Sequence, residues 1–369
     1  MTVLALARPE IVAMQPYSSA RMEARGGSVL LNANESPWPP FAEGQAWNRY
    51  PDPQPPALVA RMAGLYGVAA DQLLAGRGSD EGIDLLVRAF CRAGQDAVLI
   101  SPPTFGMYAV SARVQGAAVV EAPLRADFSL DVEAVLAAVT PAVKLVFVCA
   151  PNNPTGAGVA RAAILQLAEA LAGRALLVVD EAYVEFVASD GPDSSVAACI
   201  RDFDNLVVLR TLSKAWALAG VRIGALLGNA DVVALLRKIM PPYPLPAPCV
   251  EPTLQALSHQ GERAMRGHVA EIRQERARMQ QVLAELPGVR AVLPSQANFL
   301  TVRFHDAQAG FAALRNAGVV VRDVRRYPGL DDALRITIGS PEQNDCVLDA
   351  LRAPAGARLR AARTEKQPA

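Results

Sequence analysis

Cysteine and histidine are scarce in this sequence, with five cysteines and three histidines among 369 residues. The cysteines lie far apart, are odd in number and form no CxxC pair. This spacing excludes a disulfide framework and predicts buried free thiols in a reducing compartment, which we expect to be the cytoplasm. The histidines form no HExxH pattern, so we expect no zinc or other metal site.

Excess charge and long apolar runs are also absent. Lys and Arg together number 36, as do Asp and Glu, so the formal net charge is zero. A nucleic-acid partner is therefore not expected, because such proteins carry an excess of basic residues that contact phosphates. No apolar run reaches the roughly 18 residues that a membrane span needs, and the N-terminus, MTVLALARPE, lacks the features of a secretory signal. We expect no membrane partner.

Short apolar runs that alternate with amphipathic stretches dominate residues 57–240. The expected strands are 98–100, 118–121, 145–149, 176–180, 206–209 and 223–227, and the expected helices are roughly 80–93, 105–115, 129–139, 159–172 and 230–239. The runs LVFVC and LLVVD are continuously apolar, which is typical of strands covered on both faces. This pattern predicts an α/β fold with a mostly parallel central sheet flanked by helices.

A proline-rich segment, PPYPLPAP (241–248), predicts a boundary between two domains. A long helix is expected over 249–286, followed by strand, strand, helix, strand, strand and helix in 289–352, which is a compact α+β unit. We expect a large domain at 45–245 and a small domain formed by 1–44 and 249–352. Residues 353–369 are expected to be a flexible tail.

The segment TLSKAWALAGVRIG (211–224) contains Lys214 among small apolar residues. An apolar setting lowers the pKa of a lysine and leaves a nucleophilic amine that can form an imine. Taken alone, a lysine near a strand end is more often a solvated surface residue. Its interpretation depends on the partners that other segments supply.

Three further segments place polar groups at the same predicted sheet edge, where open α/β sheets bind ligands. Asp180 ends the apolar run LLVVD, and a carboxylate there can pair with a protonated ring nitrogen. Tyr183 can donate its hydroxyl to a ring oxygen, and Asn153, in the turn NNPTG, can offer an amide donor at the same edge. In GRGSDEGID (76–84), Gly78, Ser79 and Asp80 open a helix whose free amides form a phosphate cup. Ser79 and Asp80 are candidate N-caps.

Together these are the functional groups that a pyridoxal 5′-phosphate (PLP) enzyme needs. The amino-acid sequences of the segments strengthen that interpretation. LNANESPWP, RYPDP, GSDEGIDLLVRAF, PTFGMY, CAPNNPTG, VVDEAYVEF, RTLSKAWALAGVRIG, PPYPLP and LRITIG resemble the fold-type I, aspartate-aminotransferase-like PLP enzymes. More narrowly, they resemble the histidinol-phosphate aminotransferase subgroup. The resemblance extends from about residue 8 to residue 352. Phe105 departs from it, because many relatives carry tyrosine there.

The resemblance implies a role for each matching residue. Lys214 would be the catalytic residue that joins the cofactor and moves a proton, Asp180 would bind the ring nitrogen, and Tyr108 would stack on the ring. Tyr183 and Asn153 would hold the ring oxygen. The phosphate would be surrounded by Gly78, Ser79, Asp80, Thr211, Ser213 and Arg222. Tyr50 would reach the phosphate from a neighbouring subunit, which implies a homodimer.

The implied reaction is transamination between L-histidinol phosphate and 2-oxoglutarate, in histidine biosynthesis. Arg335 would clamp the substrate α-carboxylate, and Arg322, with Arg325 or Arg326 as alternatives, would hold the substrate phosphate. Tyr17, Asn34 and Tyr243 would line the substrate pocket. Two alternatives stay open on the same scaffold: an aromatic amino-acid aminotransferase and a PLP-dependent phosphothreonine decarboxylase. A non-enzymatic regulator is disfavoured, because no DNA-binding module precedes residue 45.

Overall fold

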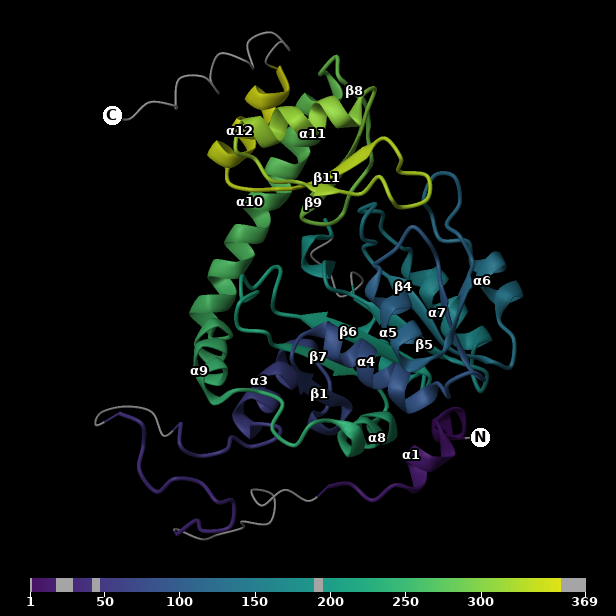
Figure 1. The fold of residues 1–369 in the computed structure, drawn as a ribbon, viewed down its shortest axis with the longest axis vertical. Coiled ribbons are helices and arrows are strands. Elements are labelled where there is room, and N and C mark those ends of the chain that lie inside the picture. The colour runs from purple at the N-terminus through teal and green to yellow at the C-terminus, as the bar shows by residue number, and fades with distance from the viewer. Residues whose placement is uncertain (1, 18–28, 42–46, 189–194, 353–369) are drawn as a thin grey trace, which may run out of the picture.

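The protein has two β-sheets of different size, joined by a long helix (Figure 1). The computed structural model describes residues 2–17, 29–41, 47–188 and 195–352. Helices cover both faces of the larger sheet, which is mostly parallel, so the predicted α/β class is confirmed. The expected flexible tail lies outside the described residues.

The larger sheet has seven strands in the order β1-β7-β6-β5-β4-β2-β3. They are β1 (Leu73–Gly76), β2 (Ala97–Ile100), β3 (Ala118–Glu121), β4 (Val143–Cys149), β5 (Leu176–Asp180), β6 (Leu206–Thr211) and β7 (Gly224–Leu227). Strands β2 to β6 run parallel to one another, whereas β7 is antiparallel to both β1 and β6. The six predicted strands are confirmed. Strand β1 was not predicted, because its four residues LLAG are too few to show a period.

Alternate residues of each central strand enter two different cores. In β5, Leu176 and Val178 pack on one face, and Leu177 and Val179 pack on the other. The first face is covered by α4 (Ser79–Phe90), α5 (Met107–Gln115) and α8 (Ala230–Ile239). The second is covered by α3 (Pro56–Tyr66), α6 (Val132–Ala138) and α7 (Arg161–Ala170). Both faces avoid water, which is why these strands read as unbroken apolar runs.

The smaller sheet is antiparallel, with the order β10-β11-β9-β8. Its strands are β8 (Val289–Val292), β9 (Phe299–Phe304), β10 (Arg322–Asp323) and β11 (Ala333–Thr337). Helices α11 (Ala307–Asn316) and α12 (Pro341–Arg352) pack on it around a separate apolar core. The predicted order of elements in 289–352 is confirmed.

The long helix predicted for 249–286 is two helices, α9 (Ala247–Ala256) and α10 (His259–Ala284). The break occurs at Ser258, whose side chain accepts a hydrogen bond from the Gly261 amide at 3.2 Å and so caps α10. Gly261 permits the sharp approach, because a Cβ there would lie 2.0 Å from the Ala256 carbonyl oxygen. With 26 residues, α10 is about 39 Å long and reaches from α9 to the smaller sheet (Figure 1).

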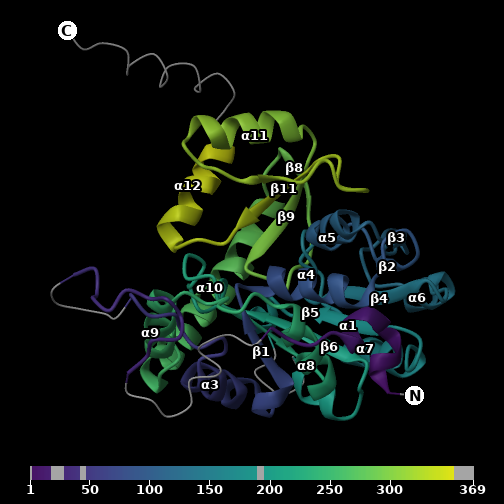
Figure 2. The ribbon, with the colours of Figure 1, turned by 60° about the horizontal axis from the view of Figure 1, so that its bottom comes forward.

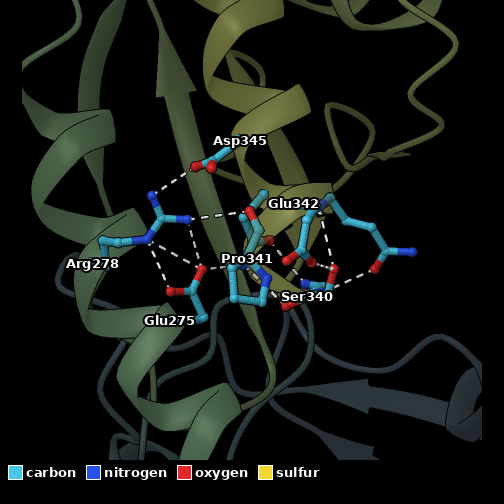
Figure 3. Close-up of polar contacts among 9 residues, drawn as sticks. Glu275, Arg278, Ser340, Pro341, Glu342 and Asp345 are labelled. Carbon is cyan, nitrogen blue, oxygen red and sulfur yellow. Dashed lines mark hydrogen bonds and ion pairs between the residues drawn. The ribbon is translucent and has the colours of Figure 1, made fainter.

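A polar network fastens α10 to α12 (Figure 3). The Arg278 guanidinium donates to Glu275 at 2.7 Å and to Asp345 at 2.8 Å. Glu275 also accepts a hydrogen bond from the buried amide of Asn344 at 2.8 Å. These contacts fix α12 on the long helix α10.

The N-terminal residues pack on the larger sheet, although the sequence had grouped residues 1–44 with the smaller domain. Val3 and Ala7 join the core beneath α4 and α8, and the Arg8 amide donates to the Ala89 carbonyl at 3.0 Å. Helix α1 (Pro9–Ala13) contacts α8 (Figures 1 and 2). Burial of the apolar side chains of Val3 and Ala7 in this core stabilises that placement.

Short 3₁₀ helices complete the fold: η1 (Val3–Leu6), η2 (Ala70–Gln72), η3 (Val184–Phe186) and η5 (Ala197–Arg201). Within the described ranges, none of the helices is both long and apolar enough to cross a bilayer. The same ranges contain no cluster of His, Cys, Asp or Glu side chains arranged to bind a metal ion.

Candidate active site

A cavity of about 320 Å³ opens at the carboxyl ends of β4, β5 and β6, facing the smaller sheet. Its lining includes these predicted residues: Ser79, Asp80, Asn153, Asp180, Tyr183, Thr211, Ser213, Lys214, Arg222, Arg322 and Arg335. Parallel strands end at one edge of a sheet, so residues distant in sequence meet there. The cavity is also lined by Phe105, Cys149, Ala182, Ala219 and Tyr327, which the sequence had not assigned to it.

Lys214 stands in the loop between β6 and β7. The Leu212 amide donates to the Ile223 carbonyl at 3.1 Å, so both ends of this loop are tied together beneath the cavity. The Lys214 amine lies 5.8 Å from the centroid of the Tyr183 ring. Burial lowers the pKa of this amine, and the nearby Arg335 guanidinium lowers it further. A lowered pKa leaves more of the amine in the nucleophilic neutral form.

Asp180 ends β5 at the floor of the cavity, with 3% of its surface exposed. One carboxylate oxygen accepts a hydrogen bond from the Tyr108 hydroxyl at 2.8 Å, and the other accepts one from the Ala182 amide at 3.1 Å. Burial raises the pKa of Asp180 to about 6, against the lowering effect of these two donors. A buried carboxylate of this kind favours a cationic partner at its open side.

Asn153 links two other cavity residues, one from each side of the cavity. Its amide nitrogen donates to the Tyr183 hydroxyl at 3.2 Å, and its oxygen accepts a hydrogen bond from Arg335 of β11. Burial raises the pKa of Tyr183 well above its usual range, so the phenol keeps its proton. The Nε atom of Arg335 is buried and has no hydrogen-bond partner among the described residues, and burial lowers the pKa of this guanidinium. An anionic ligand would satisfy it.

The opposite end of the cavity is built on the N-terminus of α4. Gly78, with φ of 86°, is the N-cap, whereas the sequence had proposed Ser79 or Asp80. The cap needs glycine because the chain turns into the helix at positive φ. The Arg222 guanidinium lies 3.3 Å from the Ser213 hydroxyl and 3.6 Å from the Asp80 carboxylate. Thr211 and Ser213 share a hydrogen bond of 3.0 Å between their hydroxyls.

Tyr108 does not line the cavity, although the sequence had assigned it to stack on a ring there. It is fully buried, and its ring stacks on Phe147 with centroids 4.7 Å apart. Phe105, three residues earlier and before the start of α5, lines the cavity instead. The motif PTFGMY signals an aromatic at this edge, but the direction of each ring depends on where the helix begins.

Four other predicted residues lie away from this cavity within one chain. Asn34 and Tyr50 line a second hollow of about 410 Å³. Tyr243 stacks on Tyr50 with ring centroids 4.3 Å apart. Tyr17 is 70% exposed and lines neither hollow.

A larger hollow of about 670 Å³ lies between α3 and α10, where it is bordered by Arg210. The Arg210 guanidinium is already paired with Glu185 at 2.6 Å and with Glu181 at 3.2 Å. No lysine is among the residues that line this hollow. The smaller cavity at Lys214 combines a nucleophile, an acid and a helix N-terminus, so it is the candidate active site.

Residues 26–351 match the family described as aminotransferase class I and II. The chain belongs to this family. Among curated aminotransferases, it is 54% identical to the histidinol-phosphate aminotransferase of Xanthomonas euvesicatoria pv. vesicatoria, covering 95% of this chain and 97% of that protein. It is also 54% identical to the enzyme of the same name from Xylella fastidiosa, covering 95% of this chain and 96% of that protein. The resemblance predicted from the sequence is therefore confirmed.

A solved aminotransferase structure also matches this fold. It is the histidinol-phosphate aminotransferase from Sinorhizobium meliloti in complex with pyridoxal 5′-phosphate. The two share 26% identity with a TM-score of 0.75, and the match covers 96% of this chain and 98% of that one.

Proposed function

We propose that this protein transfers the amino group of L-histidinol phosphate to 2-oxoglutarate, giving imidazole-acetol phosphate and L-glutamate, in histidine biosynthesis. The observation that carries the proposal is the convergence of Lys214 and Asp180 on one cavity that Arg322 and Arg335 also line. Near-full-length relatives at 54% identity bear the name of this activity. Two arginines suit a substrate set that includes a phosphate and carboxylates.

The cofactor is pyridoxal 5′-phosphate, and the cavity residues fit it. The volume of about 320 Å³ lies within the range of small-molecule sites. A helix N-terminus with the Arg222 guanidinium suits a phosphate, while the buried Asp180 suits a protonated ring nitrogen. When bound, the cofactor supplies an aldehyde that carries the amino group and a ring that draws electrons from the substrate α-carbon.

In this proposal the protein's own residues bind, orient and move protons. The Lys214 amine would hold the cofactor covalently until the amino group of the substrate displaces it, and the freed amine would then carry a proton away from the substrate α-carbon. Asp180 keeps the ring nitrogen protonated, and Tyr183 and Asn153 donate to the ring oxygen. Ser79, Asp80, Thr211, Ser213 and Arg222, with the Gly78 backbone, fix the phosphate. General acid–base transfer of this kind contributes about 10²–10⁴-fold to the rate.

Substrate binding is assigned to the side of the cavity formed by the smaller sheet. Arg335 and Arg322 are cross-strand neighbours in β11 and β10. We assign Arg335 to the α-carboxylate of glutamate, because its Nε lies buried beside Asn153. Arg322 is exposed and has no carboxylate partner among the described side chains, so it is free to meet the substrate phosphate. Arg325 is instead paired with Asp323 at 2.7 Å.

The active unit in this proposal is a homodimer. The segments 29–41 and 47–50 expose large apolar side chains: Leu31 (84%), Trp38 (76%), Phe41 (60%) and Trp47 (48%). Exposed apolar surface of this extent favours a protein partner. A second copy would cover it and bring Tyr50, Asn34, Tyr17 and Tyr243 toward the partner's cavity.

Subunit mixing tests the shared site. Tyr50→Ala and Lys214→Ala proteins would each be nearly inactive, but a mixture that exchanges subunits should regain activity, because one hybrid site carries neither change. A mixture that exchanges subunits, shown by native mass spectrometry, and stays inactive would count against the shared site.

We also propose the domain division and compartment that the sequence suggested. Residues 45–245 would form the large domain and residues 249–352 the small one, to which the sequence also assigned residues 1–44. Because Val3 and Ala7 pack in the core of the larger sheet, we propose that residues 2–13 belong with the large domain instead. All five cysteines are free thiols, which supports a reducing cytoplasm.

One spectroscopic experiment tests the reaction. Purified protein loaded with PLP is mixed with histidinol phosphate while the visible absorbance of the cofactor is followed. Conversion to the amine form, at a rate at least tenfold above that with phenylalanine, is expected. Faster conversion with phenylalanine would favour the aromatic aminotransferase, and release of CO₂ from phosphothreonine would favour the decarboxylase.

A further inference from the structure

Tyr108 is a fully buried phenol placed directly behind the acid of the cavity. It belongs to the first turn of α5, and its ring is held from two sides. Phe147 stacks on it with centroids 4.7 Å apart, and Phe105 meets it edge-on at 5.5 Å. These ring contacts fix Tyr108 without help from its hydroxyl, so the hydroxyl is available for another role.

That hydroxyl donates to the Asp180 carboxylate at 2.8 Å. The thiol of Cys149, the register partner of Asp180 on β4, is the other titratable group beside the hydroxyl. Because the Ala182 amide holds the second carboxylate oxygen, Asp180 has one donor on each oxygen. Two donors fix the plane of a carboxylate and favour its charged form.

We propose that Tyr108 is a positioning residue that, through its hydroxyl, keeps Asp180 oriented and ionised so that the carboxylate can hold the proton on the cofactor's ring nitrogen. This inference rests on the proposed function, since it requires PLP in the cavity. Tyr108 itself never touches the cofactor. It acts on the acid from the protein side, while its ring supports Phe105 from behind.

A competing interpretation is purely structural, in which Asp180 merely satisfies a buried hydroxyl. The two interpretations differ in whether the effect of the Tyr108 hydroxyl on cofactor affinity depends on the ring nitrogen. If Tyr108 acts through Asp180 and the nitrogen, its hydroxyl should matter only for a cofactor that has that nitrogen. If it only supports the fold, loss of the hydroxyl should weaken every cofactor equally.

The test measures cofactor binding to the apoprotein, with no amino donor present. Wild-type protein and Tyr108→Phe are each titrated with PLP and with its 1-deaza analogue, in which CH replaces the ring nitrogen. The preference for PLP over the analogue should fall about tenfold or more in Tyr108→Phe, the size expected for one hydrogen bond to a charged group. Combining Tyr108→Phe with Asp180→Asn should lower the preference no further than Asp180→Asn alone.

Tyr66→Phe is the matched control, because the Tyr66 hydroxyl is buried and has no hydrogen-bond partner among the described residues. Its ring lies under Arg210, in the core of the opposite face of the sheet. It should leave the preference unchanged. Equal loss of affinity for both compounds in Tyr108→Phe, or no loss for either, would overturn the proposal. If the wild-type protein bound neither compound, the proposed function would fail with it, and that result is distinct from both.

Discussion

Arg335 of the smaller sheet donates a hydrogen bond to the side chain of Asn153, which follows β4 of the larger sheet. Asn153 in turn donates to the Tyr183 hydroxyl at 3.2 Å. The residue assigned to the substrate carboxylate is therefore held by a residue assigned to the cofactor. Any closure of the smaller sheet over the cavity must keep or exchange this contact.

We predict that Asn153→Ala raises the KM for glutamate about tenfold, because Arg335 loses the partner that orients it. Arg335→Lys should raise the same KM by a similar factor, since a single ammonium cannot form a bidentate pair. The two changes combined should be less than additive, because they share one contact. Steady-state kinetics of the three variants measures this coupling, and strict additivity would contradict it.

Replacing Lys214 by alanine should lower the turnover rate about 10²–10⁴-fold or more, while cofactor binding should stay detectable. The reason is that the proton carrier is lost but the phosphate and ring contacts remain. Lys144→Ala is the control, because Lys144 lies at the opposite end of β4 and contacts the Pro141 carbonyl at 2.8 Å. The turnover rate of both variants is measured by following the absorbance of the cofactor in a single turnover. Turnover at the wild-type rate in Lys214→Ala would refute the assignment.

Arg322→Ala should raise the KM for histidinol phosphate about tenfold or more, because a charge-assisted contact to phosphate is lost. If the same guanidinium also serves the side-chain carboxylate of glutamate, the KM for glutamate rises with it. Arg325→Ala should change neither value, since Arg325 is occupied by Asp323 and by Gln308 at 3.0 Å. An unchanged KM for the phosphorylated substrate would remove Arg322 from the site.

Asp180 should make the apoprotein less stable as pH rises from about 4 to about 6. Burial raises the folded-state pKa of Asp180 from 3.8 to about 6, so in that window the folded protein retains a proton that the unfolded chain releases. The free energy of unfolding should therefore fall by up to about 3 kcal/mol across the window and stay level above it.

Urea unfolding of the wild-type apoprotein and of Asp180→Asn, compared at each pH, isolates this contribution. Asp180→Asn should have the larger free energy of unfolding above pH 6, and the values for the two proteins should converge near pH 4. Addition of PLP should reduce the difference in unfolding free energy between the two proteins at neutral pH, because a pyridinium would stabilise the ionised carboxylate. A difference that does not vary with pH would be inconsistent with the raised pKa.

Gly224 at the start of β7 should tolerate no side chain. A Cβ there would lie 2.7 Å from the Arg210 carbonyl oxygen and 2.9 Å from the Gly78 Cα. Gly224→Ala would therefore push apart β7 and the turn that leads into α4, and we expect cofactor affinity to fall about tenfold or more. Gly64→Ala in α3 is the control, since nothing lies within 4 Å of its Cβ position. It should bind the cofactor normally, as measured by fluorescence titration.

Much of the site could be predicted because strand ends in a parallel sheet meet at one edge. The apolar runs that end in Cys149 and Asp180 therefore place Asn153 and Asp180 at the same edge of the sheet without any three-dimensional information. The aromatic wall could not be predicted in this way. Phe105 precedes α5 and Tyr108 lies in its first turn, so which ring faces the cavity depends on the start of the helix, a boundary that the sequence places only within a few residues.

The residues of the smaller sheet were predictable by type but not by position. Tyr327 lines the cavity from a turn after β10, where its hydroxyl lies 3.8 Å from the Cβ position of Gly106. That contact depends on the way α10 sets one sheet above the other, which no local pattern encodes. The packing of Val3 and Ala7 in the core of the larger sheet was not predictable for a similar reason, because the choice between two apolar cores is a matter of packing.

The tie between Leu212 and Ile223 sets a fixed contour length for the chain that carries Lys214 and Arg222. Substitutions at exposed positions such as Gly220 would leave that length intact, whereas a single inserted or deleted residue would shift the amine and the guanidinium relative to each other. Over evolutionary time, this loop should accept amino-acid substitutions but keep its number of residues.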